Sequence, residues 1–224
     1  SFRLDIPREL WGEQYGLKFG DKRSLLSFFA EQGNVRIAGN GKTIYDAEVT
    51  GTPENDRWNG YQKFTFNITN QRNQLMMQQR NSDEPDSVKY MKSAQLFKKL
   101  DDKISRYEDS LVHSDNGSVV CLYLEYRSLP MLKYKQIDEI LARFTPQLEN
   151  NRYYKEMKAR ADILRRISPG VMAPDFEVKT TDGGTVKLSS FRGKYLILDF
   201  WASWCAPCRE ETVFIKELYN KFHD

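Results

Sequence analysis

The sequence predicts an α+β protein in three parts: an antiparallel β-sheet over residues 1–50, a helical region over 51–167, and a partial α/β segment over 168–224. Three observations support this division. Apolar and polar residues alternate near the N-terminus, and apolar residues recur at helical spacing through the middle. A continuous apolar run then precedes a Cys-x-x-Cys pair near the C-terminus. Because the apolar period changes twice along the chain, we expect three structural regions.

Alternation and turn residues place the strands of the first region. Phe2, Leu4 and Ile6 alternate with polar residues, and Leu25–Ala30 is a short apolar run. Gly39-Asn40-Gly41 is a good hairpin turn between the last two expected strands. The sequence therefore predicts strands near residues 2–6, 25–30, 35–38 and 45–49.

Helical spacing begins just after Thr52, which with Pro53 forms a typical helix start. The first apolar stripe runs from Tyr61 to Leu75, and a break with Pro85 follows it. Further amphipathic stretches are expected near residues 96–111, 119–126, 137–144 and 154–164, before a Ser-Pro-Gly linker at residues 168–170.

Composition excludes several classes of protein. The 34 basic and 31 acidic residues are interleaved, so a nucleic-acid partner is not expected. No apolar run approaches the length of a membrane span. Three cysteines do not make a disulfide scaffold, and Cys121, within an apolar run, is expected to be a small buried hydrophobe.

Cys205-Ala-Pro-Cys208 is the most chemically specific feature of the chain. Cys205 is expected at a helix N-terminus, where free N–H groups and the helix dipole favour a thiolate. Cys208, one turn further, is expected to be more buried and protonated, which suits a resolving thiol. Pro207 fits the first helical turn, and Trp204 supplies an apolar wall beside the exposed sulfur.

Two carboxylates are candidates for proton transfer to this pair. The run Tyr195–Trp201 is expected to be a buried strand, so Asp199 inside it should have a raised pKa and could exchange a proton with Cys208. An ion pair with a lysine is the structural alternative for Asp199. Glu211, one turn after Cys208, is the second candidate, and an ordinary exposed carboxylate is its alternative.

The segment from Asp199 to Cys208, Asp-Phe-Trp-Ala-x-Trp-Cys-x-Pro-Cys, resembles the active site of thioredoxins. Upstream, Ala173-Pro-Asp-Phe, Asp182-Gly-Gly and Leu188–Lys194 resemble the TlpA/ResA-like thiol–disulfide oxidoreductases. The resemblance covers about residues 168–224 and is specific. It implies that Cys205 is the nucleophile and Cys208 the resolving cysteine. It also implies that Asp199 is the buried acid, that Glu211 tunes the pair, and that Trp204 and Pro207 lie at the substrate.

The order of the regions also resembles Bacteroidetes-type members of this family, which carry an N-terminal β-sheet domain and helices before the thioredoxin domain. Glu31–Ile37 and Ala47–Asn55 look like parts of that N-terminal domain. The later strands of a thioredoxin domain, and the cis-proline loop that faces the cysteines in the family, would have to follow the last helix. We therefore expect a truncated thioredoxin-like domain whose catalysis is weak or absent.

The resemblance implies no cofactor and no metal. It implies a protein disulfide as substrate and a membrane-bound or soluble dithiol as electron donor, and it leaves association into oligomers open. The implied setting is extracytoplasmic: periplasmic, or membrane-associated on the outer side of the inner membrane. The implied role is in cell redox homeostasis.

Four alternatives to a redox dithiol stand beside this interpretation. Half of a zinc site would need further ligands, and Cys121, His113 and His223 lie at no ligand-like spacing. A structural disulfide does not account for the strand–turn–cysteine context. AhpC/TSA-like thiol peroxidases share the flanking motifs, but they have Thr or Ser where this chain has Ala202. The last alternative is a partner-binding or oligomerisation module with a remnant redox segment.

Overall fold

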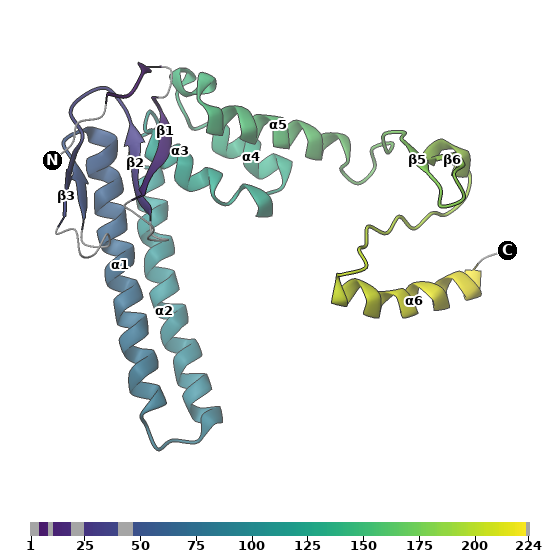
Figure 1. The fold of residues 1–224 in the computed structure, drawn as a ribbon, viewed down its shortest axis with the longest axis horizontal. Coiled ribbons are helices and arrows are strands. Elements are labelled where there is room, and N and C mark those ends of the chain that lie inside the picture. The colour runs from purple at the N-terminus through teal and green to yellow at the C-terminus, as the bar shows by residue number, and fades with distance from the viewer. Residues whose placement is uncertain (1–4, 9–10, 19–24, 40–46, 223–224) are drawn as a thin grey trace. The chain divides into compact units, whose positions relative to one another are not determined.

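The computed structural model describes residues 5–8, 11–18, 25–39 and 47–222. They form two compact units, Ser1–Val171 and Met172–Asp224, and each unit is considered by itself. Helices predominate, and the strands form small antiparallel pairs (Figure 1). The predicted α+β fold class is therefore confirmed.

Two strand pairs open the first unit. β1 (Glu13–Lys18) pairs antiparallel with β2 (Leu25–Ala30), and β3 (Arg36–Ala38) pairs antiparallel with β4 (Glu48–Thr50). Their shared apolar side is centred on Leu26, Phe28 and Val49. The strands predicted at 25–30, 35–38 and 45–49 correspond to β2, β3 and β4, whereas β1 was not predicted. The first predicted strand and the Gly39–Gly41 turn lie largely outside the described residues.

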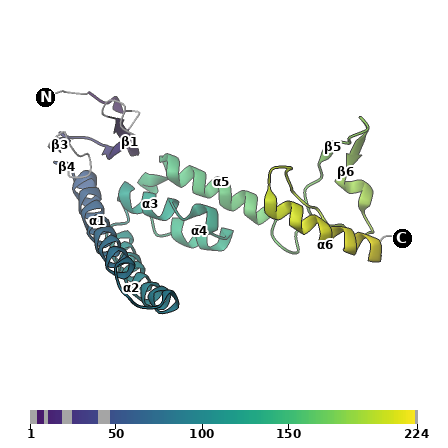
Figure 2. The same ribbon diagram turned by 60° about the horizontal axis from the view of Figure 1, so that its bottom comes forward.

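A long antiparallel helical hairpin follows, formed by α1 (Pro53–Arg80) and α2 (Asp86–Val112) (Figures 1 and 2). Thr52 is the N-cap of α1 with proline at the first helical position, as predicted. Aromatic side chains fill the proximal part of the seam, where the rings of Phe64 and Tyr107 stack with centroids 4.2 Å apart. The prediction placed the start of α2 too late, because the apolar residues in the first turns of the helix are exposed and do not mark a buried face.

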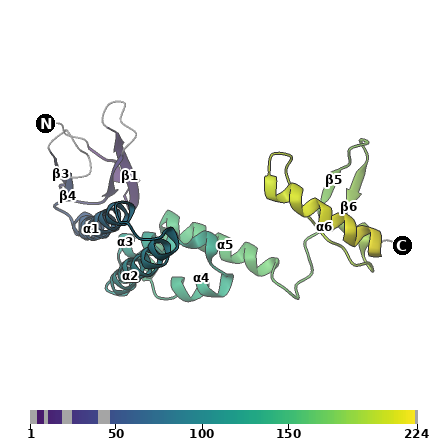
Figure 3. The same cartoon turned by 90° about the horizontal axis from the view of Figure 1, so that it is seen from below.

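Three short helices complete the unit: α3 (Val119–Tyr126), α4 (Tyr134–Leu141) and α5 (Arg152–Arg166). In Figure 3 the strands lie on one side of α1, with α2 and α3 on the other. The main core lies between α1 and these helices and includes Trp58, Leu122, Ile137 and Tyr153. Burial of these large apolar side chains contributes about 1.5–3 kcal/mol each, which makes this cluster the main stabilising feature of the unit.

Asn55 joins the strands to the helices. Its side-chain oxygen accepts from the N–H of Phe29 at 2.9 Å, and its amide nitrogen donates to the carbonyl of Phe29 at 2.8 Å. One fully buried side chain thus satisfies both backbone groups of a β2 residue, as a neighbouring strand would. The amide therefore fixes the N-terminus of α1 against the edge of β2.

The second unit contains a β-hairpin, β5 (Glu177–Lys179) with β6 (Thr185–Lys187), and the helix α6 (Ala206–Phe222). The helix that starts after Cys205 matches the prediction. The predicted buried strand Tyr195–Trp201 is wrong for this structure, because these residues form no strand and are exposed. A central strand requires hydrogen-bonding neighbours on both edges, and the described residues provide none for this run.

Candidate functional site

The candidate site lies where α6 begins. Cys205 immediately precedes the helix, and its carbonyl accepts the hydrogen bond from the Arg209 N–H at 3.2 Å that opens the helical ladder. Cys208 is the third residue of α6, and the two sulfurs are joined in a disulfide. The sequence prediction of a dithiol pair at a helix N-terminus agrees with this arrangement.

Backbone groups converge on Cys205. The N–H of Cys208 points at Cys205 Sγ at 3.3 Å, and the N–H of Cys205 donates to the carbonyl of Ala202 at 3.0 Å. Both cysteines are partly buried, so the pair is accessible from solvent. An N–H aimed at Sγ from the start of a helix would stabilise negative charge on this sulfur once the disulfide is reduced.

The other four predicted site residues make no hydrogen bond or ion pair, among the described residues, that assigns them a role. Trp204 is 84% exposed, and Pro207 is exposed in the first turn of α6. Asp199 and Glu211 are also exposed in this structure, so the burial on which the prediction for Asp199 depends is not present here. The structure brings together Cys205 and Cys208, and the roles of the other four residues stay predictions.

Arg209 belongs to the site, although the sequence prediction missed it. Its guanidinium donates to the carbonyl of Ser203 at 2.7 Å, across the turn that leads into Cys205. The signal in the sequence was a basic residue directly after the second cysteine, near the positive end of a helix dipole. Cations are disfavoured at that end, so this residue type at this position called for an explanation.

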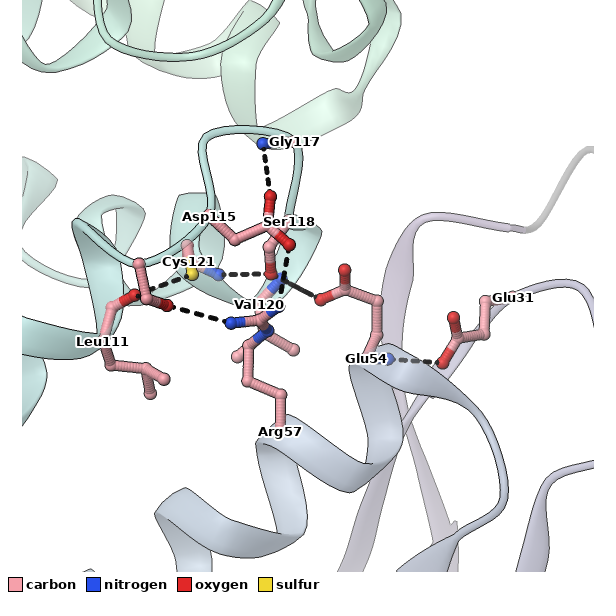
Figure 4. Close-up of polar contacts among 10 residues, drawn as sticks. Glu31, Glu54, Arg57, Leu111, Asp115, Gly117, Ser118, Val120 and Cys121 are labelled. Atoms are coloured by element: carbon pink, nitrogen blue, oxygen red, sulfur yellow. Dashed lines mark hydrogen bonds and ion pairs between the residues drawn. The ribbon is translucent and has the colours of Figure 1, made fainter.

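A second polar cluster joins α1 to α3 in the first unit (Figure 4). The carboxylate of Glu54 accepts from the Ser118 hydroxyl at 2.7 Å and from the Val120 N–H at 2.9 Å. Burial raises the pKa of the Glu54 carboxyl, and these two hydrogen bonds act in the opposite direction. Arg57 lies alongside and donates to Asp115 at 2.7 Å. The bonds satisfy free N–H groups at a helix start, so the cluster holds the fold together.

Cys121 lies beside this cluster and is fully buried, as predicted. Its thiol donates to the carbonyl of Leu111 at 3.1 Å (Figure 4). Burial raises the pKa of the thiol, which lowers the thiolate fraction and hence the reactivity. Cys121 is therefore a packing residue.

Two further properties concern the described residues alone, namely 5–8, 11–18, 25–39 and 47–222. Within those ranges, no group of three or more His, Cys, Asp or Glu side chains is placed to hold a metal ion. Over the same ranges, no helix combines the length and the apolar character that crossing a membrane requires.

Comparison with known proteins places the dithiol segment in a recognised class. Residues 169–224 match the model of the AhpC/TSA family. The matched segment contains both site cysteines, the β5–β6 hairpin and the start and body of α6.

Relatives over the same segment carry redox names. Thioredoxin-like protein YneN of Bacillus subtilis is 41% identical over 58 residues, which is 26% of this chain and 34% of that protein. Thiol-disulfide oxidoreductase ResA of Bacillus subtilis is 39% identical over 56 residues, which is 25% of this chain and 31% of that protein. ResA of Oceanobacillus iheyensis is 41% identical over 59 residues.

The match is partial on both sides. The chain spans about a third of the length of these relatives, and the matched part is about a quarter of the chain. No solved structure matches the chain significantly. The resemblance to TlpA/ResA-like proteins is thus confirmed for the C-terminal segment.

Proposed function

We propose that this chain is part of a thiol–disulfide oxidoreductase that reduces protein disulfides. The observation that carries the proposal is the Cys205–Cys208 disulfide at the start of α6, with the Cys208 N–H aimed at Cys205 Sγ. The similarity of this segment to proteins named ResA supports the same chemistry. A closed pair at a helix N-terminus can store two electrons as a dithiol and release them on forming the disulfide.

The proposed reaction has two exchanges. In the reduced pair, the Cys205 thiolate attacks one sulfur of the substrate disulfide, and the other substrate sulfur leaves as a thiolate that takes a proton. Cys208 then loses its proton and attacks Cys205 Sγ. This second attack breaks the mixed disulfide, releases the second substrate thiolate and forms Cys205–Cys208. Two electrons pass to the substrate, and a dithiol donor, membrane-bound or soluble, restores the reduced pair.

The remaining predicted residues take supporting roles in this proposal. Asp199 would accept the proton of Cys208, and Glu211 would tune the pair. Trp204, highly exposed beside Cys205, and Pro207 would contact the substrate chain. The proposal needs no cofactor, because the electrons come from the partner dithiol.

The same proposal covers organisation and setting. The sheet region 1–50 and the helical region 51–167 would present or select the partner of the redox segment 168–224, and would mediate any association. The setting would be extracytoplasmic, in the periplasm or at the outer side of the inner membrane, with a role in cell redox homeostasis.

The test is a redox titration of the pair in this chain against glutathione buffers, read by alkylation and mass, together with insulin reduction. We expect one two-electron transition at a thioredoxin-like potential, and insulin turnover that is weak in this chain and lost in Cys205→Ser. A pair that titrates like an unstructured dithiol would reject the proposal for this chain. Consumption of hydrogen peroxide that depends on Cys205, without disulfide reduction, would instead indicate a thiol peroxidase.

A further inference from the structure

Arg209 makes an unusual contact at the candidate site. It is the fourth residue of α6, and its side chain folds back across the first turn to the carbonyl of Ser203 at 2.7 Å. Ser203 lies two residues before Cys205, in the turn closed by the bond from the Cys205 N–H to the Ala202 carbonyl. The guanidinium therefore joins the body of the helix to the turn that positions the first cysteine.

This placement opposes the helix dipole. The N-terminus of a helix carries a partial positive charge, so a cation near it is unfavourable by about 0.3–1 kcal/mol. The hydrogen bond to the Ser203 carbonyl, at about 0.5–1.5 kcal/mol, is similar in size to this cost and holds the guanidinium in this position. A cation close to a helix N-terminus is repelled by the partial positive charge there. An anion that forms near both of them stabilises both. The thiol of Cys205, directly before the helix, can form such an anion once the disulfide is reduced.

We infer that Arg209 is a positioning residue of the dithiol, anchored on the Ser203 carbonyl so that its positive charge favours the thiolate of Cys205. This inference rests on the proposed function and deepens it. The guanidinium stays charged throughout the pH range in which thiols titrate. It would thus add to the Cys208 N–H a second, permanent source of stabilisation for the attacking sulfur.

The consequence for exchange follows from the thiolate. Reduction of the disulfide adds two electrons and leaves Cys205 as a thiolate and Cys208 as a thiol after uptake of one proton. Stabilising the thiolate lowers the pKa of Cys205 and stabilises the reduced form, which makes the pair easier to reduce. Arg209 would therefore set how strongly the pair drives substrate reduction.

The other charged residues near Cys205 act in the opposite sense. Asp199 precedes it by six positions, and Glu210 and Glu211 follow Arg209 on α6. Each is a carboxylate that raises the cost of a nearby thiolate. Among the charged residues 199–217, all within the part of the chain that the structure describes, Arg209 is the one that hydrogen-bonds to the turn before Cys205. Loss of Arg209 would leave these acids uncompensated.

The test compares four variants of the full chain: Arg209→Lys, Arg209→Gln, Arg209→Ala and Lys216→Gln. Lys216 is an exposed cation of the same helix, two turns beyond the site, so its loss changes net charge equally. The chain is reduced, the reductant is removed, and the rate of Cys205 alkylation is followed against pH by peptide mass. The equilibrium of the pair with glutathione is measured in parallel.

We expect Arg209→Gln to raise the pKa of Cys205 by about half a pH unit and to shift the glutathione equilibrium about threefold toward the disulfide. Arg209→Lys should stay near wild type, because it keeps the charge, and Arg209→Ala should shift at least as far as Arg209→Gln. An unchanged profile in Arg209→Gln, or an equal shift in Lys216→Gln, overturns the inference. Insulin turnover of the wild-type chain tests the proposed function separately, since alkylation requires no turnover.

Discussion

Glu54, in the first turn of α1, accepts a hydrogen bond at 2.7 Å from Ser118, the N-cap of α3, which lies 64 positions further along the chain. The same carboxylate oxygen accepts from the Val120 N–H at 2.9 Å. The N–H of Glu54 in turn donates to the carboxylate of Glu31 at 3.0 Å (Figure 4). Acidic side chains thus link the end of β2, the start of α1 and the start of α3.

Replacement of Glu54 by alanine should destabilise the first unit. The change leaves the Ser118 hydroxyl and the Val120 N–H without their acceptor in a partly buried site, at about 1–3 kcal/mol for each unpaired group. We expect the free energy of unfolding, measured in urea, to fall by about 2–4 kcal/mol. Glu54→Gln keeps one acceptor oxygen and should cost less. The exposed Glu139→Gln is the matched control, and an equal loss there would contradict the role given to Glu54.

The raised pKa of Glu54 predicts the sign of a pH effect. The ordinary carboxyl value is 4.5, and burial raises it in the folded state. As pH rises above 4.5, the unfolded chain releases the proton first, so stability is lost until the folded carboxyl also ionises. The wild type should therefore lose stability relative to Glu54→Gln between pH 4 and pH 7. The difference between their free energies of unfolding should fall with the slope expected for about one titrating group. A difference that stays flat or rises would contradict this assignment.

The helices of the first unit could be predicted because their signals are local. Thr52-Pro53 marks the start of α1, and the apolar periods match the seams that the structure buries. The start of α2 was placed too late because the apolar residues of its first two turns, Val88, Tyr90 and Met91, are exposed and do not form a buried stripe. A helix is built from bonds within one segment, so sequence alone largely defines it.

The strands were harder to predict, because pairing joins distant residues. β1 reads Glu-Gln-Tyr-Gly-Leu-Lys, where the alternation is limited to Tyr15 and Leu17 with a glycine between them, and it forms a strand by pairing with β2. Conversely, Tyr195–Trp201 has the composition of a buried strand but lacks strand neighbours among the described residues. The strand propensity of a segment describes how well its residues fit into a sheet. The sheet itself forms only where segments distant in the sequence pair with one another.

In the candidate site, too, the features set by consecutive residues could be predicted, and those that depend on tertiary packing could not. The position of Cys205 and Cys208 at a helix start depends on a few consecutive residues and agrees with the sequence prediction. The roles of Asp199 and Glu211 depend on what packs around them, and they stay predictions. Arg209 was missed because its significance lies in one bond to a backbone carbonyl, which no motif records.

The thiols of the reduced chain should fall into two kinetic classes. Cys121 has 0% exposure and a pKa raised by burial, whereas Cys205 and Cys208 are partly exposed. With a thiol reagent in excess, we expect two fast reactions and a third that waits for unfolding of the first unit. Labelling kinetics measured at several urea concentrations separate the classes. The double variant Cys205→Ser, Cys208→Ser isolates the slow thiol, and fast labelling of that variant without urea would show Cys121 to be accessible.

Replacement of Cys208 alone should trap the reaction halfway. In Cys208→Ser, the Cys205 thiolate can still attack a substrate disulfide, but no resolving thiolate attacks Cys205 Sγ to release the product. We expect a covalent complex with a disulfide-containing protein, seen as a mass addition on Cys205 that dithiothreitol removes. Cys205→Ser is the matched control, since Cys208, assigned as the resolving cysteine, should form little complex. Equal trapping in both variants would mean that the two cysteines are interchangeable, and the assignment of Cys205 as the nucleophile would then be wrong.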